Sequence, residues 1–256
     1  MSLSRITEQV MQRVSDLTGV PVLVNPDPAL KLIATSTVAR GSAPAHLISY
    51  NPAISASADY VICFQCGFIL RTFTVPAAER VDLQGSWRGR KEAEKLLAEH
   101  LRGTKLSLPK ETKMQLRDRL FDGLLRQLRS VPVGLRVDAW IAAEYPELHG
   151  QQRVIVGRQL NENMGALGPE IRRFAPAKIF GSNLAMNSAY AAYWSRLWSD
   201  PTLLSPYRAV GSMESAELLL RAFDETPADP ASDRRLMETW GDNLGLSGWF
   251  EFAPFK

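Results

Sequence analysis

Apolar positions in the first fifty residues follow a helical period and then a strand-like pattern. Within residues 4–18, Ile6, Val10 and Val14 recur at four-residue steps, which predicts an amphipathic helix that ends at Gly19. Short apolar runs divided by turn residues follow, and they cover residues 20–24, 30–38 and 46–50. Three such runs in succession predict three strands of a small antiparallel sheet.

A second helix is predicted over residues 58–73, where apolar side chains go nearly all the way round the helix axis. Ser57 or Asp59 is placed to cap its first turn, and Pro76 follows its end. A helix that is apolar on most sides is typical of the centre of a core rather than of a surface.

The rest of the chain is helical in character. Helical periodicity predicts helices over residues 91–102, 110–129, 135–144, 151–166, 177–198, 212–223 and 232–244. The aromatic segment 245–252 is expected to be extended. We therefore expect an α+β protein in two parts. Residues 1–75 would form a small antiparallel sheet with a buried central helix, and residues 76–256 a mainly helical part packed on it without a clean linker.

Composition narrows the class of protein. The chain has 256 residues, 45% apolar residues, a net charge of +3 and two cysteines, which excludes a disulfide-rich scaffold and is ordinary for a globular domain. The first ten residues lack the apolar core of a secretory signal. The longest uncharged apolar stretch, residues 60–70, is about half the length of a bilayer span. We expect a cytoplasmic protein that is not inserted in a membrane.

One segment of the predicted helix 58–73 carries a lead to function. It reads Phe64-Gln65-Cys66-Gly67-Phe68, and it follows a helix, three strands and an Asn-Pro turn. This order of elements resembles the catalytic core of zincin metallopeptidases, in particular the ImmA/IrrE type. Those proteins carry His-Glu-x-Gly-His on this helix, where two histidines four residues apart bind zinc and the glutamate is the general base. The resemblance covers residues 4–75 and depends on the element order, on Gly67 and on residues 59–62.

Every group that performs chemistry in that family is replaced here. Phe64 and Phe68 stand at the two histidine positions, and Gln65 stands at the position of the glutamate. A phenyl ring cannot coordinate zinc and an amide is not a base near neutral pH. The resemblance therefore implies a metal-free pseudoenzyme without a cofactor, which acts through a protein partner or a small ligand. A third ligand by family analogy, Glu92 or Glu94, has no function without the first two.

Two other chemical interpretations of the same region remain open. Cys63 and Cys66 form a Cys-x-x-Cys pair, which in redox proteins stands at the start of a helix rather than inside one. The same two thiols together with His46 give three zinc ligands, one fewer than a structural site uses. Buried cysteines that pack as small apolar residues are the simpler interpretation.

A basic segment suggests a third class of function. Residues 76–130 hold thirteen Lys and Arg against eight Asp and Glu, and Trp87 lies beside the cluster. The candidate patch consists of Arg88, Arg90, Lys91, Arg117 and Arg126. It would attract phosphates, but Glu92, Glu94, Glu99, Asp118 and Asp122 dilute its field, so we do not expect nucleic-acid binding. The partner and the oligomeric state are not set by the sequence.

The predicted helix 177–198 carries a polar pair on an otherwise aromatic helix. Asn183 and Asn187 are four residues apart and share a face, so they need hydrogen-bond partners if they are buried. The spacing of Tyr190, Tyr193 and Trp194 on the same helix is typical of a core rather than of a ligand pocket.

Overall fold

The computed structural model describes residues 3–255 and has an α+β fold, as expected. The chain divides into two compact units. The first unit comprises Met1–Arg80, Gly134–Gln159 and Pro254–Lys256, and the second comprises Val81–Val133 and Leu160–Ala253. This division differs from the expected boundary at residue 75, because a helical segment from the middle of the chain belongs to the first unit.

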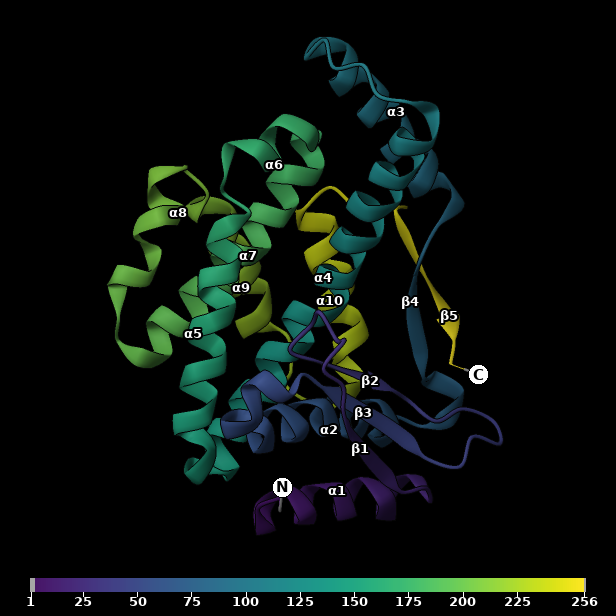
Figure 1. Cartoon of the computed structure of the whole chain (residues 1–256), viewed down its shortest axis with the longest axis vertical. Helices are drawn as coiled ribbons and strands as arrows, with labels where there is room; N and C mark the ends of the chain where they lie inside the picture. The colour runs from purple at the N-terminus through teal and green to yellow at the C-terminus, as the bar shows by residue number, and fades with distance from the viewer. Residues whose placement is uncertain (1–2, 256) are drawn as a thin grey trace. The chain divides into compact units, whose positions relative to one another are not determined.

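Helix α1, Arg5–Thr18, opens the first unit close to its predicted bounds. The hydroxyl of Ser4 accepts a hydrogen bond from the Thr7 amide at the start, and Gly19 ends the helix in the left-handed conformation with φ of 77°. The helix buries Thr7, Val10 and Val14 and packs along helix α2 (Figure 1). The amphipathic pattern therefore predicted both the helix and the face that it buries.

The three predicted strands form one sheet in the order β1-β3-β2, with β1 at Val22–Pro26, β2 at Ala34–Thr37 and β3 at His46–Tyr50. Strands β2 and β3 are antiparallel, but β1 is parallel to β3, so the expectation of an all-antiparallel sheet was wrong in this pairing. Alternation along a strand indicates which side chains are buried. It does not indicate which strand pairs with it or whether that pairing is parallel or antiparallel.

A short 3-10 helix, η1 (Pro52–Ser57), leads into α2, Ala58–Thr74, which is the central helix of the first unit. Helix α2 packs against α1 and the sheet. By length and composition, Pro52–Thr74 is apolar enough to cross a bilayer, but 61% of its most apolar window is buried inside the protein. In this structure it is the core helix of a globular unit.

Helix α4, Lys110–Glu144, joins two helices that the sequence predicted separately. Pro132 lies inside it without ending it, and the division between the two units falls just after this proline. Beyond it, Val137 and Ile141 belong to the same apolar cluster as α2, which is why this part of α4 belongs to the first unit. The 3-10 helix η3, Pro146–Leu148, and α5, His149–Gly165, follow.

The second unit is mainly helical. Its elements besides parts of α4 and α5 are β4 (Val81–Gly85), α3 (Trp87–Gly103), α6 (Pro169–Phe174), α7 (Ala177–Trp198), η4 (Pro201–Leu204), α8 (Ser205–Ala209), α9 (Met213–Glu225), η5 (Pro230–Ser232), α10 (Asp233–Asn243) and β5 (Phe250–Pro254). Helix α7 packs on α9, and α9 on α10. The core contains Trp194, Trp240 and Trp249, all fully buried. Strand β4, which was not predicted, pairs with β5.

Candidate functional site

Phe64, Gln65, Gly67 and Phe68, the positions on which the resemblance depends, lie on α2. Phe64, Gln65 and Phe68 are half-buried, and Gly67 is buried. The rings of Phe64 and Phe68 meet edge to face with their centroids 5.3 Å apart. Two aromatic rings one turn apart therefore lie on the same face of α2.

Gly67 is the point of close approach between α2 and α4. A Cβ atom placed at Gly67 would lie 2.4 Å from Cγ1 of Val137 and 3.3 Å from Cζ3 of Trp140. Any larger residue would force the side chain of Val137, or the helices themselves, to shift. The glycine that supported the resemblance has a packing role here.

Gly134, on α4, faces the rings of Phe64 and Phe68. A Cβ atom at Gly134 would lie 3.3 Å from Cζ of Phe64 and 3.6 Å from Cζ of Phe68. The sequence did not single out Gly134, because it lies between the predicted helices 110–129 and 135–144, where a glycine is unremarkable. Position 134 is thus a place on another helix that approaches both rings.

A buried polar triad lies next to these positions, and we name it by its residues Tyr60, Asp138 and Gln152. The Tyr60 hydroxyl donates to Oδ1 of Asp138 at 2.6 Å, and the Gln152 amide donates to the same oxygen at 3.2 Å. Burial raises the pKa of Asp138 to about 7, although both hydrogen bonds lower it. The sequence placed Tyr60 in the core and missed the triad, because Asp138 and Gln152 lie far along the chain from it.

A second carboxylate, Asp59, anchors the start of α1. Its Oδ1 accepts from the Ser4 amide at 2.8 Å and from the Thr7 hydroxyl at 2.6 Å. Burial raises the pKa of Asp59, but the hydrogen bonds from Thr7 and Ser4 outweigh it, so the pKa lies below its ordinary value. Asp59 is a structural link between α2 and α1.

The two thiols lie in the core. Cys63 and Cys66 are fully buried and are not joined by a disulfide. The Cys63 Sγ contacts Oγ1 of Thr7 at 3.7 Å. Burial raises the pKa of Cys63 to about 12 and that of Cys66 well above its ordinary value. Thiols in this state are poor nucleophiles and poor metal ligands, because both functions require the thiolate.

His46 is a satisfied core residue. Its Nδ1 accepts from the Ala39 amide at 3.0 Å, so in the neutral ring Nε2 carries the proton and donates to Oγ1 of Thr18 at 3.1 Å. Burial lowers the pKa of His46. Both ring nitrogens are engaged, and residues 3–255 contain no group of three His, Cys, Asp or Glu side chains spaced to hold a metal.

Three of the five residues in the candidate basic patch are paired with acids of their own unit. Arg90 contacts Asp118 at 2.6 Å and Asp122 at 3.0 Å, while Arg117 contacts Asp118 at 2.8 Å. Glu94 pairs with both Lys91 and Arg117, and Glu92 pairs with Lys178. All of these ion pairs lie within the second unit. Arg88 and Arg126 are exposed.

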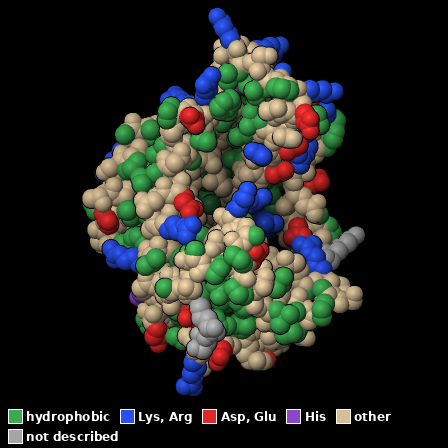
Figure 2. Space-filling view, viewed as in Figure 1, with side chains coloured by type: hydrophobic (Ala, Val, Ile, Leu, Met, Phe, Trp, Pro, Cys, Tyr) green, Lys and Arg blue, Asp and Glu red, His purple; other side chains and the backbone are tan. Residues whose placement is uncertain are grey.

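Basic and acidic side chains are interspersed on the visible face of the molecule (Figure 2). Trp87, next to the candidate basic patch, has 76% of its surface exposed. The patch is thus a set of local ion pairs with one exposed aromatic residue beside it, and its attraction for a polyanion is weakened by the paired acids.

The predicted asparagine pair is partnered by a third amide. Asn183 donates to Oε1 of Gln127 at 2.6 Å, Gln127 donates to Oδ1 of Asn187 at 3.1 Å, and Asn187 donates to Oδ1 of Asn183 at 3.1 Å. Each amide gives and receives one hydrogen bond, so the ring is closed. This arrangement satisfies the polar groups and leaves little capacity for a ligand.

Comparison with known proteins gives no relative for this chain. No protein-family model, no curated protein and no solved structure matches it.

Proposed function

We propose that this chain is a catalytically inactive, metal-free scaffold of the zincin-like ImmA/IrrE type, which acts in the cytoplasm by binding a protein or a small ligand. The observation that carries the proposal is the cluster of Phe64, Phe68 and Gly134. Three positions on two helices meet there, and none of them has a side chain that can bind a cation.

The geometry of a catalytic zinc centre explains why this cluster matters. Such a centre takes three protein ligands and keeps a fourth position for water. Two ligands at i and i+4 of one helix need the third from another element that approaches both. In this chain Gly134 approaches both Phe64 and Phe68, and it has no side chain.

The residue at the place of the general base supports the same conclusion. Gln65 cannot accept a proton near neutral pH, so it cannot activate a metal-bound water. The buried carboxyl described above, Asp138, is held by Tyr60 and Gln152. Its hydrogen bonds are those of a structural group that joins α2, α4 and α5.

Thiol chemistry is not part of the proposal, because burial raises the pKa of both cysteines. Nucleic-acid binding through Arg90, Lys91 and Arg117 is not part of it either, since all three form ion pairs within their unit. The cytoplasmic location is supported by two unpaired thiols in the core, which suit a reducing compartment.

The proposal is tested by restoring the three ligands. The triple variant Phe64→His/Phe68→His/Gly134→Glu is expected to bind one zinc ion per chain, measured by metal analysis and by competition with a chromophoric chelator. Two histidines four residues apart bind zinc weakly on any helix, so the decisive comparison is with Phe64→His/Phe68→His alone. We expect the triple variant to bind at least tenfold more tightly, as a third ligand in the correct place requires.

The matched control is Phe64→Leu/Phe68→His/Gly134→Glu, which keeps the new carboxylate and loses one imidazole. Circular dichroism with and without zinc establishes that each variant is folded. If the folded triple variant binds zinc no better than the double variant, position 134 is not at a ligand position and the zincin-like proposal fails. If the triple variant does not fold, a solved structure of the wild-type chain decides, because a fold unlike the zincins would also overturn the proposal.

A further inference from the structure

A basic surface lies in the second unit where α3 ends and α4 begins. Its six exposed basic residues come from this turn and from α6, and we call them the basic tip: Arg102, Lys105, Lys110, Lys113, Arg172 and Arg173. In Figure 2 Lys and Arg side chains project from the top of the view, which is where Figure 1 places the turn between α3 and α4. The basic tip lies wholly within the second unit.

The charges of the basic tip are not neutralised by ion pairs. None of the six side chains forms an ion pair with an Asp or Glu among residues 3–255. This separates the basic tip from Arg90, Lys91 and Arg117, whose charges are paired with acids of the second unit. The six charges are therefore available to an anion outside the chain.

The charge balance along the chain supports the same conclusion. Residues 99–113 and 169–174 together hold six Lys and Arg against three acids, Glu99, Glu111 and Glu170, a net charge of +3. The whole chain has 30 Lys and Arg and 27 Asp and Glu, so the remainder has 24 of each and is neutral as a whole. The net positive charge of the protein is thus concentrated in these two segments, where it attracts an anionic surface.

Backbone geometry holds the two segments of the basic tip next to each other. Nε2 of His100 donates to the backbone carbonyl of Arg173 at 2.8 Å, which places the end of α6 beside the last turn of α3. Lys105 has the left-handed conformation with φ of 55°, and the Leu106 amide donates to the Leu101 carbonyl at 3.0 Å. Helix α3 ends at this turn, and the chain then enters α4. The charges are therefore presented by a defined turn and by the helix beside it.

Two large apolar side chains are exposed among these charges. Met114 is 48% exposed and lies one helical turn from Lys110, while Ile171 is 47% exposed and directly precedes the two arginines of α6. Apolar side chains beside basic ones are typical of surfaces that bind at the boundary between lipid head groups and acyl chains. The phosphates of a nucleic acid gain nothing from them, and residues 99–114 contain no Phe, Tyr or Trp that could stack on a base.

From these observations we propose that the basic tip binds peripherally to a membrane surface that contains anionic lipids. The six cations contact the head groups, and Met114 and Ile171 enter the boundary between the head groups and the acyl chains. No helix crosses the bilayer in this mode, which agrees with the burial of most of α2 inside the protein. The inference goes beyond the scaffold function proposed above and does not depend on it.

The test is sedimentation of the full-length protein with vesicles of phosphatidylcholine, alone or with one third phosphatidylserine. We expect the partition coefficient to be roughly a hundredfold higher on the anionic vesicles, as a net three charges near such a surface predict. Lys110→Gln/Lys113→Gln is expected to lower the partition coefficient on the anionic vesicles by roughly thirtyfold.

The matched control is Arg126→Gln/Arg129→Gln, which removes two exposed and unpaired charges from the same helix with the same spacing. These residues lie at least thirteen positions beyond Lys113, about 20 Å along α4, which is more than twice the Debye length in physiological salt. The control variant is expected to lower the partition coefficient by less than about twofold. All four substituted residues are exposed, and circular dichroism establishes that each variant is folded.

Two further measurements separate the apolar contribution and the alternative partner. Met114→Ser/Ile171→Ser keeps every charge and is expected to weaken binding to the anionic vesicles by roughly tenfold. The proposal is overturned if the wild-type protein does not sediment with the anionic vesicles, or if Lys110→Gln/Lys113→Gln binds them as well as the wild type. Binding to a short duplex DNA without binding to vesicles would assign the basic tip to nucleic acid and would overturn the proposal as well.

Discussion

Two buried tyrosines, one in each unit, are in opposite chemical situations. Tyr60 on α2 is 3% exposed, and its hydroxyl donates to the buried carboxyl of Asp138 at 2.6 Å. Tyr207 on α8 is 1% exposed, and its hydroxyl has no partner in the part of the chain that the structure describes. The residue type and the burial are the same, and only the surroundings differ.

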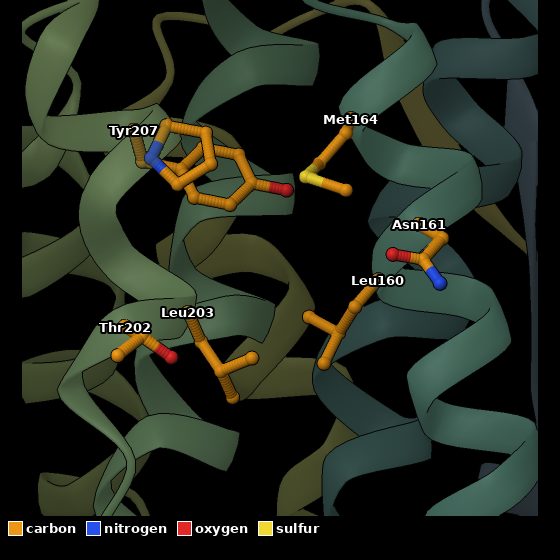
Figure 3. A pocket seen from close by; sticks show the side chains of 7 residues that line it. Leu160, Asn161, Met164, Thr202, Leu203 and Tyr207 are labelled. Atoms are coloured by element: carbon orange, nitrogen blue, oxygen red, sulfur yellow. The ribbon is translucent and has the colours of Figure 1, made fainter.

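The difference shows that two equally buried hydroxyls can lie in interiors that satisfy them to different degrees. Around Tyr60 the helices are in close contact, with Gly67 against Val137 and Gly134 against Phe64, so the polar groups there hold helices together. Tyr207 lies beside a small pocket (Figure 3), and its hydroxyl is buried without a hydrogen-bond partner among residues 3–255. Hydrogen-bond satisfaction therefore separates the two interiors better than composition does.

We expect the largest effect from Asp138→Asn, which removes the titratable carboxyl that Tyr60 and Gln152 hold. The Asp138 carboxyl has an ordinary pKa of 3.8 and a pKa of about 7 in the folded protein. Between these values the folded state binds the extra proton, so the stability that depends on Asp138 is present below about pH 4 and is lost as the pH rises through 7. Asp138→Asn keeps an acceptor for Tyr60 and removes this loss.

The measurement is the free energy of unfolding by urea at pH 4 and pH 8. The wild type is expected to lose roughly 2–4 kcal/mol relative to Asp138→Asn between the two values. Using the difference between the proteins cancels the titration of other groups, including His46, whose lowered pKa acts in the opposite direction. A difference that stays constant with pH would show that Asp138 is solvated and that this interior is open.

The next effect tests the close packing of α2 against α4. Gly67→Ala places a methyl group 2.4 Å from Cγ1 of Val137, and it is expected to cost about 1–3 kcal/mol of stability. Gly157→Ala on α5 is the matched control, since a Cβ atom there meets nothing within 4 Å. That variant should be stabilised by about 0.5–1 kcal/mol, because alanine favours the helix. Urea unfolding at pH 7 checks both, and equal effects would contradict the packing.

The smallest effects compare the two tyrosines directly. Tyr60→Phe is expected to cost about 1–2 kcal/mol at pH 8, because it leaves the ionised Asp138 short of a donor, and less at pH 5, where the carboxyl is protonated. Tyr207→Phe is expected to change stability by less than about 0.5 kcal/mol, since its hydroxyl has no partner to lose. Equal losses in urea unfolding would mean that the two interiors are alike.

Much of the secondary structure could be predicted from local patterns. Helix α7 has the bounds that were predicted, residues 177–198, and the strand at residues 46–50 is also as predicted. Strand β4 was missed although Val81-Asp82-Leu83-Gln84 alternates apolar and polar residues, because only two apolar positions mark so short a segment. Helices were predicted separately over residues 110–129 and 135–144, yet α4 continues through the segment between them, which contains Pro132. Tertiary packing on both sides of a proline can outweigh its local cost.

The candidate site could be predicted only in part. The sequence placed Phe64, Gly67 and Phe68 on one buried helix, because a local run of residues carries that information. Gly134 and Asp138 lie about seventy residues further along, and their approach to α2 depends on how the chain folds back. The pocket at Tyr207 gave no signal at all, since a tyrosine with a free hydroxyl and one with a partner look the same in a sequence.

What the sequence determined by itself was the set of amphipathic and apolar segments, the absence of His and Glu from the segment Phe64-Gln65-Cys66-Gly67-Phe68, and the α+β class. These depend on side-chain chemistry and on periods of a few residues, which are local properties. The tertiary structure decided which strands pair, which glycine faces the two phenyl rings, and which buried hydroxyl has no hydrogen-bond partner among residues 3–255. Those outcomes depend on contacts between distant parts of the chain, and no local pattern encodes which of the distant groups will meet.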